Sequence, residues 1–121
     1  MRVAVFDYVP SAILSAVDFP EDVDVLFFRE PGDPVEQIHG LRPFPAAVFV
    51  AQPPGATTGY AAAARLRDCY PGLRIIAVRT ADAQRDRFLA VGADAVIDPA
   101  GIDKEISKLR KEREKAAAAA G

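Results

Sequence analysis

Polar side chains that could do chemistry follow short apolar runs at four places in the sequence. The residues at these four places are Asp7 and Tyr8, Ala51 and Gln52, Thr80, and Asp98 with Pro99, of which Ala51 and Pro99 are apolar. If the runs are parallel strands, these residues meet at the carboxyl edge of one sheet, where open α/β sheets bind ligands. A carboxylate at such an edge can attack a phosphoryl group or ligate Mg²⁺. This edge is therefore the first place to look for a site.

Five apolar runs of strand length divide the chain, at residues 3–6, 23–28, 46–51, 74–78 and 95–97. Most lack the in-out alternation of a half-exposed strand, which is typical of parallel strands covered on both faces. Segments that can form helices lie between and after them, at residues 11–18, 34–39, 59–70, 83–91 and 102–115. This alternation predicts an α/β fold with a doubly wound five-stranded parallel sheet. The flavodoxin-like strand order 2-1-3-4-5 is the one we expect at this length.

Composition favours one globular domain. Half of the 121 residues are apolar and 26% are charged, which suffices for a single hydrophobic core. We expect a domain over residues 1–115, followed by an alanine-rich tail or linker over residues 116–121. Because alanine propagates helix well, the alternative is that this run extends the last helix.

Charge and cysteine content bear on partners and compartment. A formal net charge of -2 gives no field that would predict a membrane or nucleic-acid partner. Cys69 is the only cysteine, so no disulfide can form within the chain. The first apolar run has four residues before a charge, too short for a signal peptide or a membrane span. We therefore expect a cytoplasmic protein.

Three segments of the chain resemble motifs of response-regulator receiver domains. Residues 79–81, Arg-Thr-Ala, are similar to the Thr-Ala that ends the fourth strand in that family. Residues 90–95, Ala-Val-Gly-Ala-Asp-Ala, resemble the Ala-Gly-Ala-Asp stretch that leads into the fifth strand. Residues 53–55, Pro-Pro-Gly, with Gly59 after them, resemble the Met-Pro-Gly loop that follows the phosphoacceptor. The resemblance covers about residues 2–113.

The resemblance implies a phosphoacceptor Asp at the end of the third strand, and this chain has none. Val50, Ala51 or Gln52 stands there, and no Asp or Glu occurs between Glu36 and Asp68. Aspartyl phosphorylation needs a carboxylate oxygen as the nucleophile, which an amide cannot replace. We therefore expect no phosphorylation and no enzymatic activity.

The other receiver positions also depart from the family pattern. Of the acidic pair after the first strand only Asp7 is kept, with Tyr8 beside it, so we expect no metal or other cofactor. The family Lys after the fifth strand is replaced by Asp98, whose charge we expect to repel a phosphoryl group. The aromatic switch position of the fifth strand falls on Val96, which we expect simply to pack.

These departures favour a phosphorylation-independent receiver-like domain that acts by protein–protein contact in a two-component phosphorelay. One alternative is a small flavodoxin-like ligand-binding domain with a pocket among Asp7, Gln52, Thr80 and Asp98. Another is the receiver half of a transcription or antitermination regulator that uses residues 104–115. The alternating charges of that segment are more typical of a solvated helix face, so a nucleic-acid partner is less favoured.

We place the contact surface on the fourth helix, fifth strand and fifth helix, a face that receivers commonly use for docking and self-association. Ile102, Ile106 and Leu109 form one stripe that should face the sheet. The residues left facing outward would be Arg85, Asp86, Lys104, Lys108 and Lys111. A two-fold contact could pair such mixed charges, so a homodimer is possible.

Overall fold

The computed structural model describes residues 1–8, 19–30, 32–52 and 57–120, and the side chains of residues 117, 119 and 120 are not among what it describes. Its sheet has five parallel strands in the order β2-β1-β3-β4-β5, which confirms the predicted topology. The strands are β1 (Arg2–Phe6), β2 (Asp24–Phe28), β3 (Ala47–Ala51), β4 (Arg74–Val78) and β5 (Ala95–Ile97). Their carboxyl ends share one edge because all of them run the same way.

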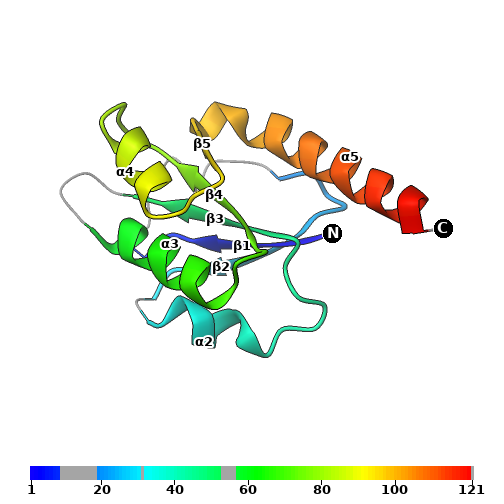
Figure 1. Ribbon diagram of the computed structural model, residues 1–121, viewed down its shortest axis with the longest axis horizontal. Helices are drawn as coiled ribbons and strands as arrows, with labels where there is room; N and C mark the ends of the chain where they lie inside the picture. The colour runs from blue at the N-terminus through cyan, green and yellow to red at the C-terminus, as the bar shows by residue number, and fades with distance from the viewer. Residues whose placement is uncertain (9–18, 31, 53–56, 121) are drawn as a thin grey trace.

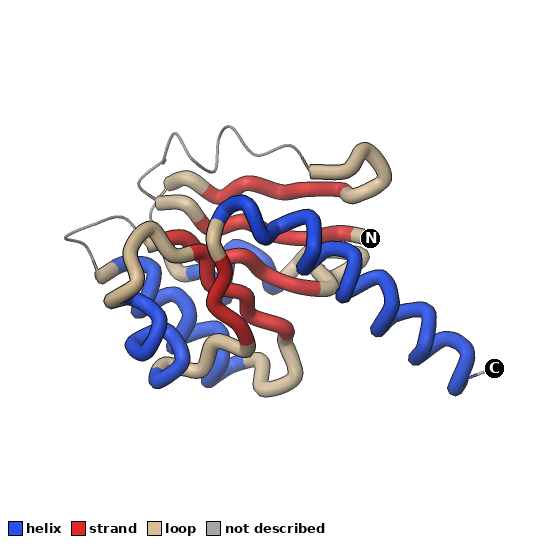
Figure 2. Tube along the Cα trace, turned by 90° about the horizontal axis from the view of Figure 1, so that it is seen from above, coloured by secondary structure: helices blue, strands red, loops and turns tan. Residues whose placement is uncertain are grey.

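Helices cover both faces of the sheet, as Figures 1 and 2 show. Side chains of three helices pack on one face, and those of the last helix pack on the other. The first three are α2 (Pro34–His39), α3 (Thr58–Cys69) and α4 (Gln84–Ala90). A 3-10 turn, η1 (Pro99–Gly101), leads from β5 into α5 (Ile102–Ala120). The helix expected at residues 11–18 lies outside the described residues.

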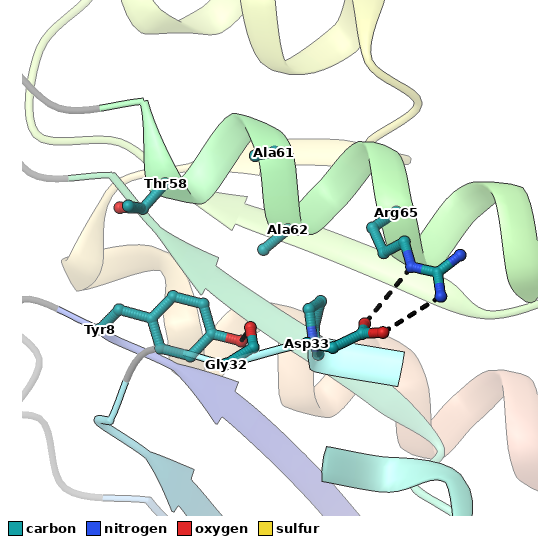
Figure 3. Close-up of a pocket in the computed structure, with 8 residues that line it drawn as sticks. Tyr8, Gly32, Asp33, Thr58, Ala61, Ala62 and Arg65 are labelled. Carbon is teal, nitrogen blue, oxygen red and sulfur yellow. Dashed lines mark hydrogen bonds and ion pairs between the residues drawn. The ribbon is translucent and has the colours of Figure 1, made fainter. Parts of the chain in front are cut away.

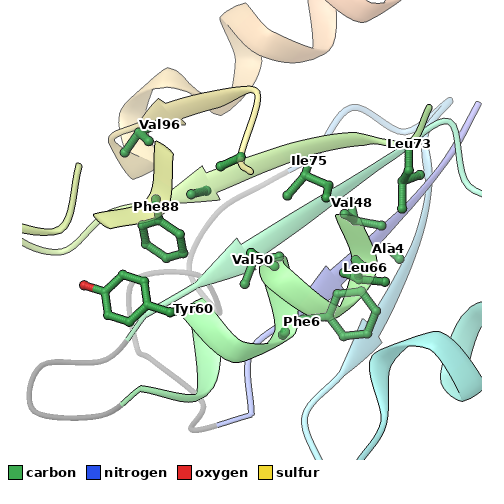
Figure 4. Close-up of a cluster of buried hydrophobic side chains, with 14 of the residues drawn as sticks. Ala4, Phe6, Val48, Val50, Tyr60, Leu66, Leu73, Ile75, Phe88 and Val96 are labelled. Atoms are coloured by element: carbon green, nitrogen blue, oxygen red, sulfur yellow. The ribbon is translucent and has the colours of Figure 1, made fainter. Parts of the chain in front are cut away.

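Alternate residues of each central strand enter two separate core layers, which explains the continuous apolar runs. On β1, Ala4 and Phe6 pack toward α2, α3 and α4, in the layer drawn in Figure 4. Val3 and Val5 pack toward α5 in the second layer. All four are at most 1% exposed, so each layer is dry at its centre. These layers hold the carboxyl edge in place.

Strand β2 departs from the expectation that the strands are covered on both faces. It pairs with β1 at the edge of the sheet, and its burial is only partial. Phe27 is 39% exposed, with the Arg29 guanidinium 5.0 Å above its ring. An edge strand has one neighbour instead of two, which leaves part of its surface to solvent.

Helix α5 is longer than predicted. Its stripe of Ile102, Ile106 and Leu109 is buried against the sheet, as expected from the spacing. The helix continues through the alanine run to Ala120, which is the alternative that we gave for this run. Figure 1 shows its last turns reaching past the sheet toward the C-terminus. None of the described helices is both long and apolar enough to cross a membrane.

Candidate functional site

The carboxyl ends of β1 and β3 bring Asp7 and Gln52 to the same edge of the sheet. Phe6 is level with Val50 in the pairing of the two strands, so Asp7 comes level with Ala51. Asp7 and Gln52 are each 1% exposed, and Ala51 is 7% exposed. The end of β3, where the resemblance implies a phosphoacceptor, therefore carries a buried methyl group and, next to it, a buried amide.

Gln52 caps the N-terminus of α3. Its Oε1 accepts hydrogen bonds from the backbone N–H groups of Gly59, at 2.8 Å, and Tyr60, at 3.3 Å. The first N–H groups of a helix have no partner within the helix, so an acceptor from outside satisfies them. A Cβ on Gly59 would lie 2.6 Å from both Gln52 Oε1 and the Ala51 carbonyl oxygen, so a glycine is needed for this close approach. Gln52 is thus a residue of the site whose side chain stabilises the N-terminus of α3.

Thr80 and Gln84 join the ends of β3 and β4. Thr80 Oγ1 donates to the Gln52 carbonyl oxygen at 3.0 Å, and Gln84 Nε2 donates to the same oxygen at 3.2 Å. Gln84 Oε1 in turn accepts from the Thr80 backbone N–H at 2.9 Å. Gln84 is 7% exposed, so its side-chain amide makes these hydrogen bonds within the protein and not with solvent. Sequence reasoning singled out Thr80 and missed Gln84.

Asp98 is not the isolated negative charge that the sequence suggested. Its Oδ1 accepts from Arg79 Nε at 2.8 Å, and Arg79 Nη1 also lies 2.6 Å from Asp82 Oδ1. The hydrogen bond with Asp98 raises the pKa of Arg79 further above its ordinary value, against a smaller opposing effect of burial. Arg79 therefore offsets part of the repulsion that we expected from Asp98, and because Arg79 is shared with Asp82 the three side chains together stay negative.

Two of the four residues of the ligand-binding alternative, Thr80 and Asp98, line one hollow. Thr80, Asp98 and Pro99 border a hollow of about 370 Å³ together with Arg79, and neither Asp7 nor Gln52 lines it. Gln52 turns under the N-terminus of α3, and a pocket among all four residues stays a prediction.

The Tyr8 side chain contacts α2 and the loop before it. Its hydroxyl donates to Gln37 Oε1 at 2.7 Å and lies 3.2 Å from the Gly32 carbonyl oxygen. Burial, and to a lesser degree the charge of Asp33, raises the pKa of Tyr8 to about 12. Tyr8 therefore belongs to the side of the molecule formed by α2 and α3.

The residues at this edge do not fit an Mg²⁺ site. Such sites combine carboxylate oxygens with a few further oxygen ligands, and Asp7 is the one carboxylate that ends β1 or β3. Within residues 1–8, 19–30, 32–52 and 57–120, no three His, Cys, Asp or Glu side chains gather as a metal site would require. We derive no chemistry through a cation here.

The remaining predicted positions lie on or beside α4, β5 and α5. Val96 is 9% exposed and packs in the same layer as Phe88. Lys104, Lys108 and Lys111 line a hollow of about 580 Å³. All five residues of the predicted contact surface are exposed, namely Arg85, Asp86, Lys104, Lys108 and Lys111. The loop at residues 53–55 lies outside the described residues.

Solved structures of receiver domains superpose on most of this chain. A response regulator receiver domain protein (CheY-like) from Methanospirillum hungatei has a TM-score of 0.67 at 21% identity, over 94% of this chain and 97% of that one. The Vibrio cholerae chemotaxis protein CheY4 has a TM-score of 0.69 at 15% identity, over 89% and 97%. A Burkholderia pseudomallei response regulator, solved with a phosphorylated aspartic acid and a calcium ion, has 0.66 at 16%, over 99% and 72%.

Sequence comparison adds no closer relation, since no protein-family model and no curated protein matches the chain. At these identities the superpositions establish the fold alone. The chain has the receiver-domain fold of two-component response regulators, as the resemblance implied. In that fold, Ala51, Gln52 and Asp98 stand at the edge where the resemblance implies an Asp and a Lys.

Proposed function

We propose that the chain is a receiver-fold domain that works without aspartyl phosphorylation and acts by protein–protein contact in a two-component pathway. The observation that carries this proposal is the capping of α3 by Gln52 at the end of β3, where the resemblance implies a phosphoacceptor. In this arrangement the site residue stabilises the fold and has no reactive oxygen to offer.

The polar groups of the edge are committed to one another. Thr80 Oγ1 and Gln84 Nε2 converge on the Gln52 carbonyl oxygen, which ties β3 to the start of α4. Two neutral side chains held by several hydrogen bonds provide no anionic group for a cation and no free cation for a phosphoryl oxygen. These hydrogen bonds favour a structural role for Thr80 and Gln84, which fix the end of β3 against the start of α4.

The contact surface that we propose is the outward side of α4, β5 and α5. Ile102 and Ile106 anchor α5 by its opposite side, so its lysines project to solvent. Lys104, Lys108 and Lys111 recur at helical spacing and share one hollow. On α4, Asp86 is an exposed carboxylate on the same proposed surface. A two-fold contact would bring lysines of one copy against carboxylates of the other, so weak homodimerisation is part of the proposal.

A titration with beryllofluoride and Mg²⁺ tests the proposal. Heteronuclear NMR spectra should show no shifts at Asp7, Ala51 or Thr80, because a single carboxylate gives a weak cation site. Specific Mg²⁺ binding tighter than roughly millimolar, which corresponds to about -4 kcal/mol, would contradict it.

A further inference from the structure

A pocket of about 350 Å³ lies between the start of α2 and one side of α3, with Tyr8 after β1 and Thr58 at the start of α3 among the residues that line it. Figure 3 shows the Tyr8 ring on one side of it and Ala61 and Ala62 of α3 on the other. The two alanines leave this part of α3 without bulk, and Tyr8 supplies a flat apolar wall. This pocket, which we call the slot, is therefore lined mostly by apolar atoms.

The Tyr8 wall is held in position. Its hydroxyl is fixed by Gln37 Oε1 at 2.7 Å, and its ring makes an edge contact with the Phe6 ring at a centroid distance of 5.9 Å. A wall that is already fixed costs little ordering entropy when a second group packs against it. The slot is thus prepared for a planar apolar group.

An ion pair closes one end of the slot. Arg65 Nη2 lies 3.1 Å from Asp33 Oδ2, and Arg65 Nε lies 3.3 Å from Asp33 Oδ1. Because the two charges offset each other, the pocket favours a neutral occupant. A guanidinium also interacts favourably with the negative face of an aromatic ring, and Tyr8 adds an aromatic contact. Charge complementarity therefore favours an aromatic ring over an aliphatic group.

We infer that this pocket receives an aromatic side chain of a protein partner, an inference that rests on the proposed function by protein contact. Gly32, Thr58, Ala61 and Arg65 are all exposed around it, so the pocket is open along one side. Free small ligands are usually buried over roughly 70–90% of their surface. A side chain carried by a partner needs less enclosure, and aromatic residues seated in pockets dominate protein interfaces.

The test is an NMR titration of the whole chain with N-acetyl-tryptophanamide, with N-acetyl-leucinamide and with free indole. We expect the tryptophanamide to shift the amides of Ala61 and Ala62 with a Kd of about 1 mM, the affinity of an isolated contact of about -4 kcal/mol. The leucinamide should bind more weakly. Tyr8→Leu should weaken the tryptophanamide roughly two- to tenfold, the worth of one aromatic pair, with little effect on the leucinamide.

Two alanine variants provide the matched comparison. Ala61→Phe fills the slot from an exposed position of α3 and should abolish the shifts, whereas Ala118→Phe, on the exposed end of α5, should leave them unchanged. Shifts that persist in Ala61→Phe, equal affinity for both amides, or no shifts at all would overturn the inference. Indole that binds while the capped amide does not would also overturn it, in favour of a free ligand. Phosphorylation by acetyl phosphate would contradict the proposed function and leave this titration unaffected.

Discussion

The cap that Gln52 provides for α3 leads to a quantitative prediction about stability. Gln52→Ala removes the oxygen that accepts from the backbone N–H groups of Gly59 and Tyr60, both of which are buried. Losing a helix cap costs about 1 kcal/mol, and a buried donor left unsatisfied costs about 1–3 kcal/mol. The 3.3 Å bond is the weaker of the two. We therefore expect the free energy of unfolding to fall by about 2–3 kcal/mol.

Urea unfolding followed by circular dichroism measures this loss as a lower midpoint with an unchanged slope. At roughly 3–6 °C per kcal/mol for a domain of this size, Tm should fall by about 10 °C. Thr57→Ala is the matched control, because Thr57 occupies the N-cap position of α3 but makes no side-chain capping bond. It should change the unfolding free energy by less than about 0.5 kcal/mol. A larger loss in Thr57→Ala than in Gln52→Ala would refute the reasoning.

Three further predictions concern packing, pH and association. Gly59→Ala should destabilise the protein by about 1–3 kcal/mol through its clash with the Ala51 carbonyl oxygen, whereas Gly72→Ala, whose Cβ meets nothing within 4 Å, should be neutral in the same urea assay. Because the folded state raises the pKa of Tyr8 from 10.0 to about 12, the stability that Tyr8 contributes is full below pH 10 and lost as the pH rises toward 12. In urea unfolding between pH 10 and 12, Tyr8→Phe should not show this pH-dependent loss of stability. A pH profile identical to that of the wild type would contradict the role given to Tyr8. Sedimentation across a series of protein and salt concentrations should show a weak dimer of the wild-type chain. Changing Lys104, Lys108 and Lys111 together to Glu should abolish that dimer, and a dimer that persists in this variant would exclude the proposed surface of α4, β5 and α5.

The fold was predictable because each element has a local signature. Buried parallel strands give continuous apolar runs, and the 102, 106 and 109 spacing gives the inward side of α5. The partial burial of β2 did not follow from its apolar run, although the predicted order 2-1-3-4-5 already placed this strand at the edge of the sheet. It also left open whether the alanine run forms helix, because propensity alone is a weak guide at a chain end.

The sequence predicted which residues lie at the carboxyl edge of the sheet, but it did not predict the contacts that these residues make. That no carboxylate ends β3 follows from the sequence alone. The cap from Gln52 to Gly59 depends on how closely α3 approaches the end of β3, which is a property of packing. The Arg79 pair with Asp98 joins residues 19 apart, so the sequence suggested a lone negative charge where the structure has an ion pair. Gln84 carried only a faint signal, an amide four residues after Thr80 near a helix start.

Incubation with acetyl phosphate and Mg²⁺, followed by intact mass spectrometry, tests the central claim most directly. Wild type should stay unmodified because no carboxylate ends β3. Ala51→Asp and Gln52→Asp, each introducing a single carboxylate, should also stay unmodified, because Asp7 alone remains of the acidic pair and Asp98, in place of a lysine, directly follows β5. A mass increase of one phosphoryl group on the wild-type chain would contradict the account.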